Sequence, residues 1–317
     1  MSRAAKALWY RLVRTLGAAP SPPTVLKHRL TESIRFRQRQ DAFIASFGSL
    51  RALVDLAFDR QPSSEAAGLM VFGLGRRIAS DFDDIVLLST ESRPESALAL
   101  IRGMFERLIT ARYLHHHPDE AMSFANYDII QRRKLGRRIK DVLGLPEGYE
   151  EKLQQLEEEA KTIEHEYLVT DCKACNTMRL NHTWNKLDVV AMASHTEKQI
   201  EQLKTVAEQK EAARTRDRLR KLTVFGYFDP MGHTHASLKS ISARFVHAGK
   251  TLTVTEPSHE SVDHTVWLAH LLLLESLLIQ DARFHLPRFE ELFSVAMQDF
   301  KEAWVQELSN TSPSASA

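Results

Sequence analysis

Residues 97–140 read ALALIRGMFERLITARYLHHHPDEAMSFANYDIIQRRKLGRRIK, and this stretch predicts two consecutive long helices. The break between them falls before Pro118, because a proline disfavours the helical conformation of the residue that precedes it. On the first helix, Arg102 and Glu106 lie one turn apart beside an apolar stripe. Charged residues at the edge of a core are rare unless they are paired, so we expect these two side chains to form a structural ion pair.

The rest of the chain follows the same pattern. It holds only 12 Gly and 11 Pro among 317 residues, and this low content of helix-breaking residues favours long helices over turn-rich sheets. The sequence therefore predicts an all-α protein, a multi-helix bundle. We expect helices over residues 24–60, 65–89, 94–117, 118–143, an acidic segment after 148, 184–194, 194–222, 229–247, 261–282 and 287–308, with 171–183 irregular and 249–256 extended.

Two features of these helices could be mistaken for other structures. The longest apolar run, residues 265–279, contains His270 and Glu275, so we interpret it as a helix buried in the core rather than a membrane span. Gly73 and Gly75 form a Gly-x-Gly pattern, but no strand precedes it and no third glycine follows. We therefore expect a close helix crossing there and not a phosphate-binding loop.

We divide the chain into a basic amphipathic segment (residues 1–23), a helical bundle domain (24–308) and a disordered serine-rich tail (309–317). Basic residues interrupt the apolar residues of the first segment, which argues against a signal peptide. That segment either packs on its own domain, the interpretation we favour, or lies on an anionic membrane surface. The chain has only two cysteines and hence no disulfide framework, so we expect a cytoplasmic protein.

Residues 129–166 predict a charged helical hairpin that projects from the bundle. The turn at Pro146 folds a basic run back onto an acidic helix, which brings Arg137 and Arg138 near Glu157. Neutralisation within the chain explains the basic run better than binding of nucleic acid, and the net charge of the protein is only +1. The hairpin is suited to contact a protein partner or to form a homodimer. The basic residues concerned are Arg132, Arg133, Lys134, Arg137, Arg138 and Lys140.

Two cysteines and two histidines form a candidate zinc site. Cys172 and Cys175 are spaced as a metal knuckle, and His165 and His182 each lie seven residues from the nearer cysteine. Two thiolates and two imidazoles suit tetrahedral Zn²⁺ in number and in softness. Reversible dithiol chemistry and ordinary, partly buried cysteines are the other interpretations, and we favour the last, with no cofactor.

Residues 237–247, SLKSISARFVH, suggest a second kind of chemistry. Ser240, Arg244 and His247 are three to four residues apart and would share one face of the expected helix. On such a face an arginine can bind an oxyanion while a histidine transfers a proton. A polar helix face with a histidine near its C-terminus is the simpler interpretation, and spacing alone favours it.

Three short motifs stand out when they are taken together: Arg102-x-x-x-Glu106, the ending Tyr113-Leu114…Pro118, and Ser242-x-x-x-x-His247. On these motifs the chain resembles, over roughly residues 68–286, an uncharacterised family of bacterial helical proteins that is often compared with the HEPN superfamily (higher eukaryote and prokaryote nucleotide-binding domains). The resemblance implies a helical bundle, and many HEPN proteins are metal-independent ribonucleases in stress or anti-phage systems.

The resemblance also implies where catalysis would occur. HEPN active sites use an Arg-x4–6-His motif, usually completed across a dimer. Arg244 and His247 are only three residues apart, whereas Arg112 and His117 have the expected spacing but end a helix before Pro118. We take the first pair as the candidate catalytic residues and the second as the alternative.

Two hypotheses of function follow. The first is an interaction or sensor protein that uses the charged hairpin to bind a partner, because the charges are segregated and no catalytic set is complete. The second is an RNA-binding or RNA-cleaving effector, in which Arg244 holds a phosphate and His247 acts as general acid or base. Arg102, Glu106, Ser240 and Ser242 would then be structural or supporting residues.

Overall fold

The computed structural model of the chain describes residues 40–304 apart from 61–62, 92, 145–147, 173–174, 176, 203–217, 235–244, 249–250 and 255–258. The predicted segments 1–23 and 309–317 therefore lie outside the described residues, as does the first part of the helix expected over 24–60. The helices are α3 (Gln40–Phe58), α4 (Ala66–Thr90), α5 (Pro94–His116), η1 (Pro118–Glu120), α6 (Ala121–Leu143), α7 (Tyr149–Ile163), η2 (Glu164–Tyr167), α8 (Val189–Gln202), α10 (Arg218–Thr223), η3 (Val224–Phe228), α11 (Asp229–Thr234), α13 (His259–Phe284) and α14 (Phe289–Trp304).

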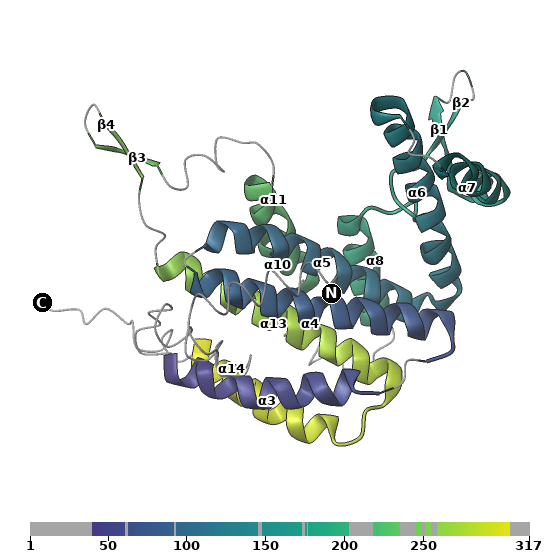
Figure 1. Cartoon of the computed structure of the whole chain (residues 1–317). Helices are drawn as coiled ribbons and strands as arrows, with labels where there is room; N and C mark the ends of the chain where they lie inside the picture. Colours follow the sequence, from purple (N-terminus) through teal and green to yellow (C-terminus); the bar gives the residue numbers. More distant parts are fainter. Residues whose placement is uncertain are drawn as a thin grey trace, which may run out of the picture.

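The predicted all-α bundle is confirmed. Helices α4, α5 and α13 pack against one another at its centre, and α3 and α14 pack together along one side (Figure 1). The core is continuous through these helices and is made largely of aliphatic side chains and phenylalanine. Such a core forms because each helix presents an apolar face at helical spacing and the faces exclude water when they meet.

Helix α13 carries the long apolar run, and the structure places that run inside the bundle. The helix is long and apolar enough to cross a membrane, but most of its apolar window is buried against other helices. The fully buried His270 accepts a hydrogen bond at Nδ1 from the indole Nε1 of Trp304, 3.2 Å away. Burial lowers the pKa of His270 to about 3, because the charged imidazolium would lose its hydration. The interpretation as a core helix is confirmed.

Helices α6 and α7 form an arm that projects from the bundle, together with the hairpin of β1 (Leu168–Cys172) and β2 (Thr177–Leu180) (Figure 1). The arm has a small core of its own, in which the half-buried Trp184 also touches the main core. Arg133 pairs with Glu164 at 2.7 Å and Arg137 with Glu157 at 2.8 Å. The predicted hairpin is confirmed, and so is its neutralisation for Arg137 with Glu157, while Arg133 pairs with a glutamate that was not predicted and Arg138 forms no ion pair within the described residues.

Three expectations about local structure are wrong. Residues 171–183 are not all irregular, because β-branched residues at 169–170 pair with the opposite strand to form β1–β2. Helix α8 runs through Ser194, which caps no second helix. The helix expected over 229–247 does not extend to residue 247, because α11 is described over Asp229–Thr234 and Phe245–Ala248 is strand β3, paired antiparallel with β4 (Thr251–Val254). The extended segment expected over 249–256 is confirmed by β4.

The Gly-x-Gly pattern of α4 is a close helix crossing at one of its two glycines. A Cβ on Gly75 would lie 2.3 Å from Nε2 of the buried Gln280, whereas a Cβ on Gly73 would meet nothing within 4 Å. That Gln280 amide donates to the carbonyl oxygen of Val71 at 2.9 Å. The amide is therefore held in place, and the crossing leaves no room for a side chain at Gly75.

We predict that the two glycines respond to alanine in opposite directions. Gly75→Ala displaces the Gln280 amide from the Val71 carbonyl and should lower the free energy of unfolding by about 1–3 kcal/mol. Gly73→Ala is the matched control and should raise it by up to about 1 kcal/mol, because alanine has the higher helix propensity. Urea unfolding measures both, and equal effects at the two positions would contradict the crossing.

Candidate functional site

The first candidate catalytic pair is not brought together on a helix. His247 lies in strand β3, so the shared helix face expected for it is wrong. Arg244, Ser240 and Ser242 lie outside the described residues. The helix prediction failed because Val246, Thr251 and Thr253, which are β-branched, favour the β3–β4 pairing over helix.

The alternative pair is divided between two sides of α5. Arg112 donates from Nη2 to Oε2 of the buried Glu275 on α13, 2.7 Å away. His117 stacks on the ring of Tyr113, with ring centres 4.3 Å apart, and its Nε2 lies 3.0 Å from Oε1 of Gln199 on α8. Five residues turn a helix by about 140°, which accounts for the separation. Arg112 is therefore a core ion-pair residue in this fold.

The candidate zinc ligands are spread around the base and tip of the β1–β2 hairpin. His165, Cys175 and His182 are exposed, and the sulfur of Cys175 lies 3.4 Å from the hydroxyl of Thr177. Cys172 ends β1. Within the described residues, no group of three or more His, Cys, Asp or Glu side chains is placed to hold a metal ion. Zinc binding by these four residues stays a prediction.

Arg102 and Glu106 form the predicted ion pair, and it lies beside an aromatic ring. Nε of Arg102 is 2.9 Å from Oε1 of Glu106, and its guanidinium lies over the ring of Tyr227, 4.8 Å from the ring centre. The Glu106 side chain is 39% exposed. Because water reaches the carboxylate, the pair stabilises the fold by no more than about 1 kcal/mol, less than a buried pair would.

Tyr227 belongs to a turn of π-helix, η3, which sequence reasoning missed. Gly226 lies so close to Phe105 that a Cβ there would be 2.9 Å from its ring. The turn leaves Phe225 and Phe228 exposed on the surface, 43% and 49% respectively. π-Helical turns are rare and occur often at functional sites. The aromatic run FGYF was the available signal, although its π geometry depends on the packing against α5.

A polar and aromatic cluster fixes the base of the arm to the bundle. The hydroxyl of Tyr113 donates to Oε1 of Glu120 at 2.8 Å, and the amide of Asn185 donates to Oε2 of the same carboxylate at 2.6 Å. Trp184 packs edge-on against both Tyr113 and Phe124. Burial and the hydrogen bond to Glu120 raise the pKa of Tyr113 to about 12. The cluster joins α5, η1 and the loop that returns from the arm, so it sets the direction of the arm.

The outer face of α6 carries an apolar stripe that no other part of the described chain covers. Leu135, Val142 and Leu143 are 60%, 71% and 79% exposed, and Ile139 between them is half-buried. Their spacing of four, seven and eight residues places them on one side of the helix. We call these four residues the α6 stripe. The charges of the hairpin predicted its ion pairs, but this stripe was not predicted from the sequence.

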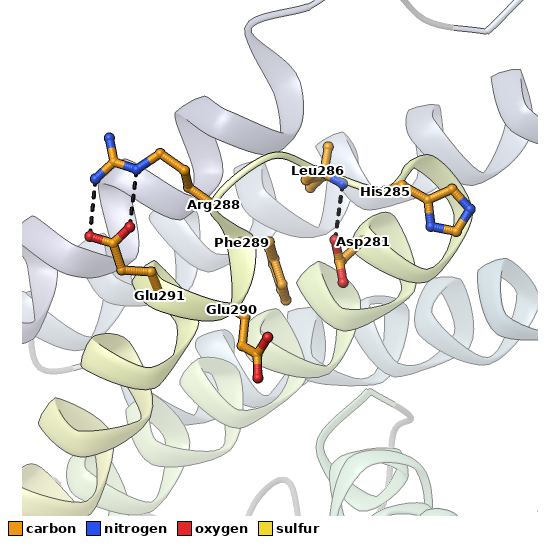
Figure 2. Close-up of a pocket in the computed structure, with 7 residues that line it drawn as sticks. All are labelled: Asp281, His285, Leu286, Arg288, Phe289, Glu290 and Glu291. Carbon is orange, nitrogen blue, oxygen red and sulfur yellow. Dashed lines mark hydrogen bonds and ion pairs between the residues drawn. The ribbon is translucent and has the colours of Figure 1, made fainter.

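A shallow hollow lies where α13 turns into α14 (Figure 2). Arg288 and Glu291 at its rim form two hydrogen bonds of 3.0 Å with each other, and Asp281 accepts from the backbone N–H of Leu286. His285 and Arg288 adopt positive φ angles of 52° and 61°, which form the turn. Arg288 is already paired with Glu291 and Asp281 already holds the turn, so neither group is directed at a ligand.

Comparison with known proteins places the chain in a family without assigning a function. A family profile described as "family of unknown function (DUF5677)" matches residues 69–251, more than half of the chain. The match spans α4, α5, η3 and the whole arm. No curated protein matches the chain, and no solved structure does.

We predict that Arg112 is required for stability. Arg112→Met leaves the buried carboxylate of Glu275 without this counter-ion and should cost about 3–5 kcal/mol of unfolding free energy. The double variant Arg112→Met, Glu275→Met should recover much of that loss, because no buried charge is left. The control is Arg51→Met in the exposed pair with Asp55, which should cost less than about 1 kcal/mol. Urea denaturation that shows equal losses for the two arginines would contradict a structural role.

Proposed function

The chain belongs to the DUF5677 family, whose function is unknown, and we propose that this protein is an interaction or sensor protein that binds a protein partner through the arm. One observation carries the proposal: the α6 stripe is exposed on a segment that stands away from the bundle (Figure 1). Exposed apolar side chains that gather on one helix face are characteristic of surfaces that bind another protein.

The arm is also built to present this surface. Its charged residues Arg133 and Arg137 are already paired with Glu164 and Glu157, so they hold α6 against α7. The cluster around Glu120 and Trp184 anchors the base of the arm. A surface that is rigid before binding loses less conformational entropy when a partner arrives, which favours affinity.

We predict that a photo-reactive residue in the α6 stripe forms a covalent adduct with a defined partner in the cells that make the protein. Benzoylphenylalanine at Val142 should give the adduct, and the same residue at Val295, an exposed valine on α14, should not. Leu135→Glu should abolish the adduct without unfolding the protein, since an exposed substitution changes stability by about 0.5 kcal/mol or less. The same adducts from both positions, or an adduct that still forms with Leu135→Glu, would argue against the arm as the surface that binds the partner.

A second candidate function has its own observation in favour. Arg102 and the exposed Phe225 and Phe228 lie at or beside η3, and a cation beside exposed aromatic rings is the combination that binds single-stranded nucleic acid. This is consistent with an RNA-binding or HEPN-like ribonuclease activity, in which Arg244 and His247 would act on the phosphate. The resemblance of the sequence motifs to those of HEPN proteins also suggests a role in stress or phage defence.

This second function predicts binding of a labelled single-stranded RNA to the purified protein. Phe228→Ala should weaken that binding about tenfold, because each stacked base contributes about 1–3 kcal/mol, and Leu69→Ala, at an exposed residue of α4, should not. Cleavage of total RNA that disappears in His247→Ala would assign a nuclease. Cleavage unchanged in that variant would remove His247 from the mechanism, and an absence of both binding and cleavage would leave the arm as the functional surface.

A further inference from the structure

Resting on the proposed function of the arm, we propose that the α6 stripe binds an amphipathic helix with acidic flanks, supplied by another protein. The helix would lie along α6 on the side away from α7 and complete a three-helix arrangement.

The face of α6 that α7 covers is defined by contacts. Gly136 lies so close to Leu153 of α7 that a Cβ would be 2.8 Å from it, and Arg133 and Ile130 are buried on the same side. At 100° per residue, Leu135 and Val142 lie roughly opposite Arg133, the middle of that side, whereas Ile139 and Leu143 lie nearer its Gly136 edge. Leu135 and Val142 therefore face away from α7, and the exposed Leu143 extends the stripe toward the edge of the α6–α7 contact.

The spacing of the side chains in the stripe favours a helix as the binding partner. Leu135, Ile139, Val142 and Leu143 repeat at four, seven and eight residues, which is the spacing at which side chains of one helix interlock with those of a second. They span about two turns, close to 12 Å of helix length. An extended strand would need unpaired backbone groups to dock against, and the hydrogen bonds of α6 are internal to the helix.

The basic residues near the stripe favour a partner helix that carries acidic residues. Arg138 is exposed on one side of it and forms no ion pair with any acidic residue of the described chain. Arg132 lies seven residues before Ile139, on the line of the stripe; its side chain is 59% exposed and pairs with Asp128 of the same helix at 2.7 Å. Guanidinium groups that flank an apolar seam favour carboxylates on the partner, as charged flanks do in paired helices.

The same charges disfavour a second copy of this chain. Two α6 helices paired antiparallel about the middle of the stripe would bring Arg138 of one copy close to Arg138 of the other. The outer face of α7 does carry carboxylates, including the exposed Glu151 and Glu158, but it has no apolar stripe to meet that of α6. Another protein with an apolar and acidic helix satisfies both requirements.

The test uses the full-length protein and three labelled peptides of three heptads. The first has Leu at positions a and d with Glu beside them, the second has Lys in place of Glu, and the third is a scrambled version of the first. We expect fluorescence anisotropy to give binding at least about tenfold tighter for the acidic peptide than for the other two, weakening as salt is added. Binding of the basic peptide as tight as the acidic one would overturn the proposal.

Variants of the protein separate the two parts of the surface. Leu135→Glu should reduce the affinity for the acidic peptide by about tenfold or more, and Arg138→Glu should shift the preference toward the basic peptide. Val295→Glu on α14 is the control and should change nothing. If neither Leu135→Glu nor Arg138→Glu changes the affinity for the acidic peptide, the peptide binds elsewhere and the proposal is overturned.

Sedimentation of the protein without peptide tests whether a second copy of the chain binds the stripe. A dimer that Leu135→Glu dissociates would make a second copy the occupant and overturn the acidic helix. An adduct at Val142 in cells, with no peptide bound in solution, would overturn the helix and leave the proposed function of the arm standing. A peptide bound at the stripe with no adduct in cells would support the helix as ligand and count against the proposed function of the arm.

Discussion

The packing of α5 between α4 and α13 is the constraint on which the rest of the structure depends. One helix supplies the centre of the core, the Arg102–Glu106 pair beside η3, the Arg112–Glu275 pair and the Tyr113 cluster at the base of the arm. Arg112 lies on a different side of α5 from Arg102 and Glu106, whereas Tyr113 lies on their side about two to three turns further along the helix. A helix that is in contact almost all round fixes the direction of each of its side chains, so it determines where both candidate surfaces can lie.

Helix α13 shows why polar groups in the core must be satisfied locally. Arg112 meets Glu275, His270 meets Trp304 and Gln280 meets the carbonyl of Val71. A buried polar group without a partner would cost several times what its hydrogen bond contributes, so these contacts orient α13 along the bundle. They also explain why polar residues interrupt the apolar run of α13. The interruption is visible in the sequence, but its cause is not.

The arm and the η3 surface present two different chemistries. In the arm, ion pairs join α6 to α7 and leave aliphatic side chains exposed on the outer side, an arrangement that suits another protein. At η3, the exposed rings of Phe225 and Phe228 lie beside the half-buried guanidinium of Arg102, an arrangement that suits planar, charged ligands. The two surfaces lie on separate elements, so substitutions in one leave the other intact and the two functions can be tested independently.

The amino-acid sequence by itself determined the helical class, most helix boundaries around α4, α5 and α6, the burial of α13 and the folding of the arm back on itself. These features follow from periodicity, prolines and the order of charges, which are local along the chain. Only the tertiary structure decided that Arg112 and His117 separate, that Phe245–Ala248 is a strand and that η3 is a π-turn. It also decided that Leu135 and Val142 remain uncovered, because exposure depends on which helices meet, and those contacts join residues far apart in the sequence.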